Sequence, residues 1–258
     1  GFAFIGPKPE HIEKMGDKVT AKQTVMDLGL PVVPGSPGAV ESVEDGIRFA
    51  KEAGFPVLIK AASGGGGKGM QVVRAEEDFA EAYNTARAEA KANFGDDTVY
   101  LEKYLEKPKH IEIQIFGDSH GNAIHLGERD CSIQRRHQKL VEEAPSPVLS
   151  EEERDAIGSL AADVIRKMGY IGAGTIEFLY EDGEFYFMEM NTRIQVEHPV
   201  TEEAYEVDLL KDQIRVAMGE KLTYKQSELV HKWASIECRI NAEDVEKDFR
   251  PTPGKLTA

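Results

Sequence analysis

The sequence predicts an α+β fold with largely antiparallel sheets. Strand-like and helix-like segments are mixed along the chain, and several neighbouring strands are joined by short, turn-rich loops that indicate hairpins. A long segment, Glu151–Met168, carries apolar residues at three- and four-residue spacing, which is typical of an amphipathic helix. The length of 258 residues, with 41% hydrophobic and 30% charged residues, suits one large domain or two small ones.

The first half of the chain opens with a strand-like apolar run at residues 2–5. A helix is expected over residues 17–28, where Gly29 is a stop signal. The stretch 31–38 is rich in proline and glycine and is typical of a linker or hinge. The segments expected next are a helix over 43–53, strands over 57–60 and 70–73 around a glycine loop, and a helix over 76–93.

The second half alternates hairpins with helices. Strands are expected over residues 99–104, 110–116 and 122–126, the last two joined by the loop 117–121. After the helix Glu151–Met168, the remaining expected segments are strands over 175–180 and 185–191, a helix over 207–218 and a strand over 233–240.

Charge and cysteine content exclude several functional classes. The chain has 31 basic and 46 acidic residues, a net charge of −15, which argues against a nucleic-acid or anionic-membrane partner. No apolar run approaches the ~20 residues that span a bilayer, and no secretion signal is visible, so we expect a cytoplasmic protein. Cys131 and Cys238 suit a reducing compartment, and we expect both to be small buried residues.

The glycine loop at residues 63–70 formally matches a dinucleotide fingerprint and nearly matches a P-loop. Both motifs require a helix directly after the loop, because the helix N-terminus holds the phosphate. Residues 71–74 indicate a strand instead, so both readings fail on context. A flexible flap over phosphates and an idle surface loop remain open, and the cations Lys60 and Lys68 favour the flap.

Several motifs together resemble a known family. Lys18, Lys60, residues 102–105, Glu177 and residues 189–191 resemble the ATP-grasp fold. The longer motifs at residues 128–139, 189–199 and 237–244 resemble the biotin carboxylase family. The resemblance implies an ATP-grasp fold with a mobile lid over residues 32–104. It also implies that residues 1–31 are the leading segment of the ATP-grasp body and that residues 105–258 are its C-terminal part, with a largely antiparallel sheet.

The resemblance also implies which residues bind ATP. Lys18 and Lys60 match lysines that contact the phosphates, and His110 matches a histidine near the ribose and phosphates. Residues expected to cover or bind the nucleotide are Gly65, Gly66, Gly67 and Met70 in the flap, Glu102, Lys103, Tyr104 and Leu105 at the adenine, and Gln134 and His137.

Glu177, Glu189 and Asn191 match the family's ligands for magnesium or manganese. Oxygen ligands of this kind suit a hard cation that also contacts nucleotide phosphates. A two-residue turn at 182–183 would send the two carboxylates to opposite faces of the hairpin. We therefore expect a three-residue loop, 182–184, which pairs Glu177 with Glu189 on one face.

The resemblance places bicarbonate in a pocket that includes Arg193, Gln195 and the amide of Val196. Glu197 is the implied general base that deprotonates bicarbonate. Lys139 matches a lysine near this pocket, and Arg239 matches an arginine that stabilises the enolate of biotin.

The activity implied by resemblance is ATP-dependent formation of carboxyphosphate, followed by carboxylation of biotin on a carrier protein or domain. A carboxyltransferase component is the implied further partner, and the family is often dimeric, with monomer and dimer both open for this chain. The alternatives are another ATP-grasp ligase and a core that binds nucleotide with little or no biotin carboxylation. The family extends beyond both ends, so we expect a fragment or an engineered core.

One segment departs from the family. Glu203 and Glu206 stand where the family has an apolar residue and a glycine. Two added charges favour exposure, and a glutamate in a glycine position raises a question about the local backbone.

Overall fold

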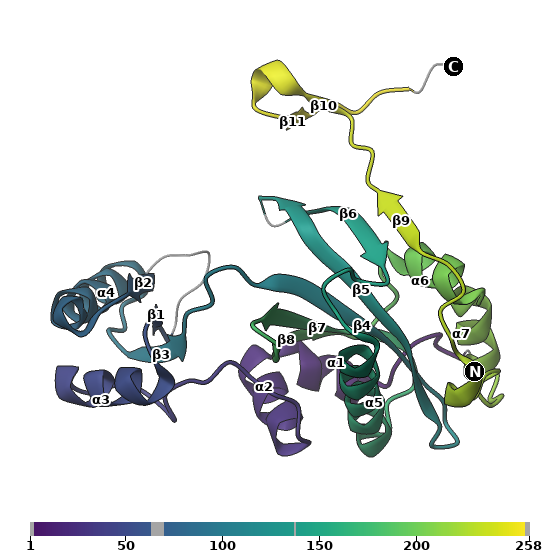
Figure 1. Ribbon diagram of the computed structural model, residues 1–258, viewed down its shortest axis with the longest axis horizontal. Helices are drawn as coiled ribbons and strands as arrows, with labels where there is room; N and C mark the ends of the chain where they lie inside the picture. The colour runs from purple at the N-terminus through teal and green to yellow at the C-terminus, as the bar shows by residue number, and fades with distance from the viewer. Residues whose placement is uncertain (1–2, 63–69, 137, 256–258) are drawn as a thin grey trace. The chain divides into compact units, whose positions relative to one another are not determined.

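The computed structural model describes residues 3–62, 70–136 and 138–255 (Figure 1). The chain divides into two compact units, one of Val32–Pro108 and one of Gly1–Pro31 with Lys109–Ala258. Helices and sheets are mixed in both, and every strand pair among the described residues is antiparallel. The predicted α+β class with antiparallel sheets is confirmed.

The smaller unit is a three-stranded sheet in the order β2-β1-β3 with two helices. Its strands are β1 (Val57–Ala61), β2 (Met70–Val73) and β3 (Val99–Lys103); its helices are α3 (Val43–Ala53) and α4 (Phe79–Phe94). Ser42 caps α3 by accepting from the amide of Asp45 at 3.1 Å, as an N-cap serine does. Phe79 is fully buried and packs with Ile59 and Leu101 in the core of this unit.

The stretch predicted as a linker, residues 31–38, instead runs beside β3. The amide of Lys103 donates to the carbonyl of Pro34 at 2.8 Å, and the amide of Ser36 donates to the carbonyl of Leu101 at 2.9 Å. Gly35 forms a bridge with Glu102. Proline keeps its carbonyl as an acceptor and favours extended backbone at an edge, so the breakers here extend a sheet edge.

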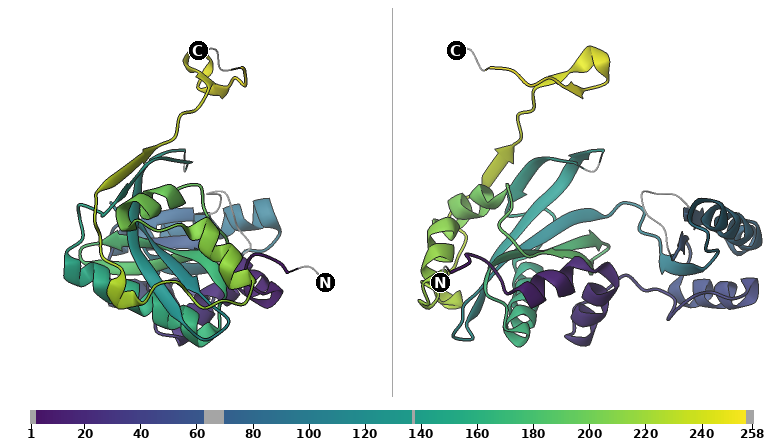
Figure 2. Two further views of the ribbon diagram at one scale, coloured as in Figure 1. Left: turned by 90° about the vertical axis from the view of Figure 1, so that its right-hand side faces the viewer. Right: turned by 180° about the vertical axis from the view of Figure 1, so that it is seen from behind.

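The larger unit contains a six-stranded sheet in the order β8-β7-β4-β5-β6-β9 (Figure 2). Its strands are β4 (Lys109–Gly117), β5 (Ala123–Arg135), β6 (Gln138–Ala144), β7 (Gly172–Glu181), β8 (Glu184–Asn191) and β9 (Ser235–Cys238). Its helices are α1 (Pro9–Gly16), α2 (Lys18–Asp27), α5 (Glu151–Met168), α6 (His198–Tyr205) and α7 (Leu209–Ala217). A short hairpin, β10 (Glu243–Asp244) with β11 (Arg250–Pro251), follows.

The two faces of this sheet carry different helices. Gly158 of α5 lies against the side chain of His125 on β5, where a Cβ on that glycine would come within 2.3 Å of the ring. On the other face, Phe116, Ile124 and Val200 pack in one core with residues of α6 and α7. The polar site described below lies on the α6 face, because Arg129 of β5 contacts Thr201 of α6.

Several expected elements differ from the observed ones. No strand is found in residues 3–5; the expected strand also included residue 2, which lies outside the described residues. Helix α1 was not expected, although it starts with a proline, a favoured first residue of a helix. Strand β5 continues far past residue 126 as far as Arg135, and β6 and α6 were also not expected. Charged residues at 128–130 hid the first of these, because each is buried with a partner.

The hairpin of β7 and β8 has the two-residue turn that was not expected. Glu181 pairs with Glu184, and the turn residues Asp182 and Gly183 both have positive φ, 52° and 84°. Glu177 nevertheless pairs with Glu189, as predicted, because the register shifts by one residue between Glu177 and Phe178. The predicted pairing is confirmed, and the predicted three-residue loop is wrong.

The acidic departure from the family lies at the end of α6. Glu203 is exposed, as its charge predicted, and Glu206 adopts left-handed backbone with φ 54° at the helix C-terminus. Its carboxylate accepts from the indole of Trp233 at 3.0 Å and pairs with Lys232. These contacts offset the strain that a glycine would avoid.

Cys131 is buried as expected, whereas Cys238 is exposed, so the prediction of two buried cysteines is wrong for Cys238. Cys238 lies on β9, which is the edge strand of its sheet. Among the described residues, none of the helices combines the length and apolar character needed to cross a bilayer.

Candidate active site

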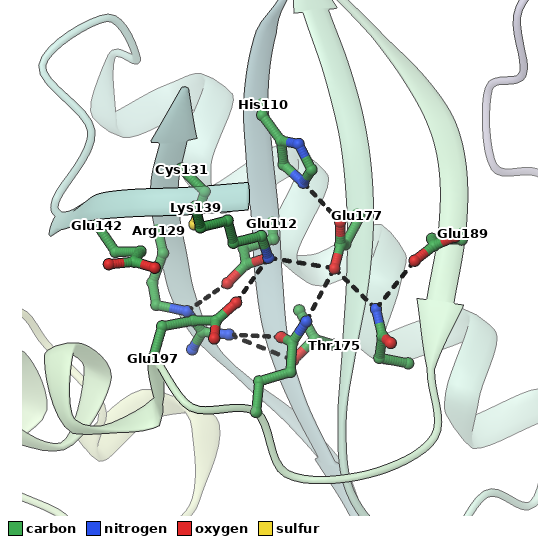
Figure 3. A network of polar contacts seen from close by, with 12 residues as sticks. His110, Glu112, Arg129, Cys131, Lys139, Glu142, Thr175, Glu177, Glu189 and Glu197 are labelled. Atoms are coloured by element: carbon green, nitrogen blue, oxygen red, sulfur yellow. Dashed lines mark hydrogen bonds and ion pairs between the residues drawn. The ribbon is translucent and has the colours of Figure 1, made fainter. Parts of the chain in front are cut away.

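A polar network lies on the α6 face of the six-stranded sheet (Figure 3). Its base is β4, in which the polar residues His110, Glu112 and Gln114 alternate with isoleucines. Alternate residues of a strand point to opposite faces, so the three polar side chains share the face that carries the network. Glu112 and Gln114 are completely buried, which requires each to be paired.

Arg129 of β5 is the central cation and is fully buried. Its Nε donates to Glu112 Oε1 at 2.6 Å. Its terminal nitrogens donate to Gln114 Oε1, Thr201 Oγ1, Thr175 Oγ1 and Gln195 Oε1, at 2.7, 2.7, 3.3 and 3.1 Å. A guanidinium has five N–H groups in a rigid plane, so these contacts fix the orientations of β4, β7 and the 195–201 segment around it.

Lys139 of β6 joins three carboxylates. Its ammonium pairs with Glu112, donates to Glu197 Oε1 at 2.6 Å and lies 3.3 Å from Glu177 Oε1. The other oxygen of Glu197 accepts from Arg239 Nη2 at 2.8 Å. Glu197, the expected general base, is 3% exposed and is therefore held between two cations in a largely dry position.

Glu177 and Glu189 face each other across β7 and β8, and the Asn191 amide lies between them. Asn191 Nδ2 donates to Glu177 Oε1 at 2.7 Å and to Glu189 Oε1 at 3.4 Å. Carboxylate and amide oxygens are the ligand types that magnesium prefers, so these three residues fit a magnesium site once the amide turns its oxygen inward. The ligand atoms of His110, Glu112 and Glu177 also lie within 4.8 Å of one another.

His110 is oriented by hydrogen bonds on both ring nitrogens. Gln134 Nε2 contacts its Nδ1 at 3.0 Å, and its Nε2 lies 2.5 Å from Glu177 Oε2. Because the amide donates to Nδ1, the ring proton lies on Nε2 and is donated to the carboxylate.

The charges of the network oppose the cost of burial. Burial disfavours the ionised form of Glu177, but the hydrogen bond from His110 and the charge of Lys139 outweigh it and lower the pKa of Glu177 to about 2. Burial likewise opposes ionisation of Glu112, and the charges of Arg129 and Lys139 again hold its pKa below the ordinary value. The pKa of Lys139 is raised by the carboxylates around it, although burial acts the other way. These three groups therefore stay charged at neutral pH.

Of the residues predicted for the bicarbonate pocket, the structure brings Lys139, Gln195 and Glu197 into the network, together with Arg239, which was predicted for the enolate of biotin. Gln195 is buried and also donates to Glu177 Oε1 at 2.8 Å. Arg193 and Val196 are exposed instead, and a guanidinium nitrogen of Arg193 donates to the carbonyl of Ile194 at 3.2 Å. An exposed cation is suited to meeting an anion that arrives from solvent.

Other predicted nucleotide residues belong to the smaller unit. Lys60 pairs with Glu102 at 2.8 Å and lies over the ring of Tyr100. The backbone amides of Lys103 and Tyr104 already donate within this unit, to the carbonyls of Pro34 and Pro56 at 2.8 and 3.1 Å. The ammonium of Lys103 also donates to the carbonyl of Gly54 at 2.9 Å.

The remaining predicted nucleotide residues are less fully described. Met70 begins β2 and is exposed, and Leu105 is the second residue after the end of β3. Lys18 is the first residue of α2, and only its backbone is described. Gly65, Gly66, Gly67 and His137 lie outside the described residues.

Three charged residues of the network were not singled out from the sequence: Glu112, Arg129 and Glu142. The alternation of polar residues with Ile111, Ile113 and Ile115 was the available signal for Glu112, because a buried strand has little reason to carry a polar residue at every second position. Arg129 belongs to a motif quoted for the family resemblance, but a lone arginine inside a strand gives no sign of its burial. Glu142 lies on β6, a strand that was not predicted from the sequence.

Comparisons with known proteins agree with this geometry. The family described as "Carbamoyl-phosphate synthase L chain, ATP binding domain" matches residues 17–225. The chain is 58% identical to biotin carboxylase 1, chloroplastic, of Populus trichocarpa, over 100% of this chain and 49% of that protein. It is 57% identical to biotin carboxylase of Nostoc sp., over 99% of this chain and 58% of that protein. The chain therefore spans about half the length of these relatives.

Solved structures of biotin carboxylase domains are also similar to this chain. The biotin carboxylase domain of a thermophilic 2-oxoglutarate carboxylase is similar to this chain in two states. The structure bound to ADP without magnesium has a TM-score of 0.90 and 52% identity, covering 99% of this chain and 59% of that one. The structure bound to bicarbonate has a TM-score of 0.90 and 50% identity, covering 99% and 58%. The fold is the ATP-grasp fold of biotin carboxylase domains, as the sequence motifs predicted.

Proposed function

We propose a function from the premise that this chain belongs to the family of the carbamoyl-phosphate synthase L chain ATP-binding domain. The function is ATP-dependent activation of bicarbonate, followed by carboxylation of biotin. The observation that carries the proposal is the position of Glu197, a buried carboxylate held by Lys139 and Arg239 close to the carboxylates expected to bind the metal. The biotin carboxylase relatives and the bicarbonate-bound neighbour support the same assignment.

In the proposed reaction Glu197 removes the proton from bicarbonate. The resulting oxyanion attacks the γ-phosphorus of ATP, the bond to the bridging oxygen breaks, and the products are carboxyphosphate and ADP. Lys139 and Arg239 supply positive charge to the anion, and Gln195 is oriented by Arg129 toward the same place. In the second step Arg239 stabilises the enolate of biotin. Arg193 and the amide of Val196 complete the anion pocket.

Magnesium, or manganese in its place, would be held by Glu177, Glu189 and Asn191. When bound, the ion would neutralise negative charge on the phosphates. His110 and Gln134 orient Glu177 for this role, and His137 is assigned to the nucleotide side.

We assign the smaller unit, 32–108, the role of a lid over the nucleotide. Lys18, Lys60 and the flap residues Gly65, Gly66, Gly67 and Met70 are proposed to meet the phosphates. Residues Glu102, Lys103, Tyr104 and Leu105 are proposed to meet adenine, with the amide of Leu105 as donor.

The partners and location are proposed in the same way. A carrier protein or domain presents biotin, and a carboxyltransferase component receives the carboxyl group. The relative from Populus trichocarpa is named as a chloroplast protein, whereas the name of the Nostoc relative gives no organelle. We assign this chain to the cytoplasm by similarity to the Nostoc relative.

The test is ATP hydrolysis by the intact protein with magnesium, measured with and without bicarbonate. Stimulation by bicarbonate, together with transfer of labelled carbon from bicarbonate to free biotin, is the expected result. Hydrolysis that is indifferent to bicarbonate would contradict the proposal. Hydrolysis that depends on bicarbonate but never labels biotin would favour another ligase of this family, or a core with little or no biotin carboxylation.

A further inference from the structure

Glu142 is a buried carboxylate that the reaction described above does not use. It lies on β6 and its side chain is completely buried. One oxygen, Oε1, accepts from Arg239 Nε at 2.6 Å. The other, Oε2, is buried without a hydrogen-bond partner among the described residues. A buried carboxylate that is only half paired is costly, so a position that retains one calls for an explanation.

The strand pairing fixes how Glu142 meets Arg239. Glu142 lies opposite Glu237 in the β6–β9 ladder, and the amide of Arg239 donates to the carbonyl of Leu140 at 2.9 Å. Arg239 is therefore the diagonal neighbour of Glu142, a spacing that long side chains bridge. The contact is built into the sheet and does not depend on a loop.

The guanidinium of Arg239 is divided between two carboxylates. Its Nε edge is taken by Glu142, and its Nη2 reaches Glu197 Oε2 at 2.8 Å. Because the guanidinium is planar and rigid, holding Nε determines where the terminal nitrogens point. Without Glu142 the two terminal nitrogens would be free to form a bidentate pair with Glu197, which is the stronger arrangement.

We propose that Glu142 is a positioning residue for Arg239, which keeps one terminal nitrogen of the guanidinium available to the bicarbonate anion and prevents Arg239 from closing on Glu197. This inference rests on the proposed function, because it assigns the anion pocket to bicarbonate. It adds a residue that determines affinity for bicarbonate and that has no part in holding ATP. The half-paired state of Glu142 follows, since its function is to hold a single N–H group.

The test compares Glu142→Gln with Glu143→Gln in the intact protein. Glutamine keeps the size of the side chain and an acceptor for Nε but removes the charge. Glu143 is the next residue of β6, lies opposite Ile236 and points to the other face, so it is a matched control. KM for bicarbonate and KM for ATP are both measured, together with the melting temperature.

We expect Glu142→Gln to raise KM for bicarbonate about tenfold, as loss of a charge-assisted hydrogen bond does, with KM for ATP unchanged. Glu143→Gln should leave both constants at the parent values. Glu142→Asp, which keeps the charge but withdraws it from Nε, should also raise KM for bicarbonate.

Three outcomes would overturn the inference. An unchanged KM for bicarbonate in Glu142→Gln does so directly. A fall in kcat and melting temperature with both KM values unchanged would mean that Glu142 only stabilises the fold. If bicarbonate does not stimulate ATP hydrolysis by the parent protein, the proposed function and this inference both fail. This outcome is recognised from the parent protein, before any variant is measured.

Discussion

Glu177 lies directly opposite Glu189 on β7 and β8, although the turn between these strands would by itself place Met188 there. Asp182 and Gly183 both have positive φ, which is the geometry of the tight turn that favours Asp-Gly. One extra residue in β8 then shifts the register by one position, as a β-bulge does. The bulge brings both carboxylates to the same face, where a divalent cation can bind them.

Deletion of Met188 tests this interpretation of the hairpin. Met188 is 39% exposed and is the residue left over when Glu177 pairs with Glu189 and Phe178 pairs with Phe187. Its removal should leave a regular ladder with the carboxylates still opposed. We expect the affinity for magnesium and a non-hydrolysable ATP analogue, measured by titration calorimetry, to stay within about threefold of the parent.

Deletion of Tyr186 is the control for this experiment. It shortens the same strand by one residue, but it turns Phe187 away from the core, where that side chain is now 5% exposed. We expect a loss of about 3 kcal/mol in the free energy of unfolding. If the Met188 deletion is as destabilising as the Tyr186 deletion, Met188 is not a bulge residue.

The two metal-site carboxylates should differ in their importance for binding. The charge of Glu177 is already opposed by Lys139 and His110, whereas Glu189 contacts the neutral Asn191 amide. We expect Glu189→Gln to weaken magnesium-dependent binding of an ATP analogue about tenfold, and Glu177→Gln to weaken it less. Titration without magnesium is the control, and there both variants should match the parent. Equal losses in the two variants would contradict this difference.

The secondary structure was most predictable where hydrophobic period and capping agree. Helix α5 begins and ends at the expected residues, because Ser150 and Glu153 form a capping box and Gly169 closes the helix in left-handed backbone. The second half of β5 and the whole of β6 were hidden because their buried positions hold charged residues such as Glu128, Arg129 and Glu142. These residues are stable there only because each has a partner far away in sequence.

The candidate site was predicted residue by residue from family motifs, and its supporting residues were not. Glu197, Lys139 and Arg239 meet as the motifs indicated. Arg129 and Glu142 act through contacts across strands and helices, and single-sequence spacing carries no information about such contacts. The hairpin shows the same limit, because local turn chemistry and the bulge each shift the register and only the folded sheet combines them.

Stability should depend on the ionisation of Glu177. Its pKa is about 2 in the folded protein against an ordinary value of 4.5, so its ionised form favours folding by about 3 kcal/mol above the ordinary pKa. This contribution is lost as the pH falls from the ordinary value through the folded one. We expect Glu177→Gln to flatten the decline in unfolding free energy between about pH 5 and about pH 2, measured by denaturant titration. Glu184→Gln, at an exposed position of the same hairpin, should keep the slope of the parent.

The last prediction concerns the general base. Glu197 is 3% exposed and is held by Lys139 at 2.6 Å and by Arg239 at 2.8 Å, so it can accept a proton from an anion bound between these two cations. Glutamine keeps the shape of the side chain and cannot act as a base. We expect Glu197→Gln to remove the stimulation of ATP hydrolysis by bicarbonate, a loss of about a hundredfold or more, with KM for ATP nearly unchanged. Glu203→Gln, at an exposed position of α6, is the control and should hydrolyse ATP like the parent. If Glu197→Gln keeps its bicarbonate dependence, another group takes the proton and the role given to Glu197 is wrong.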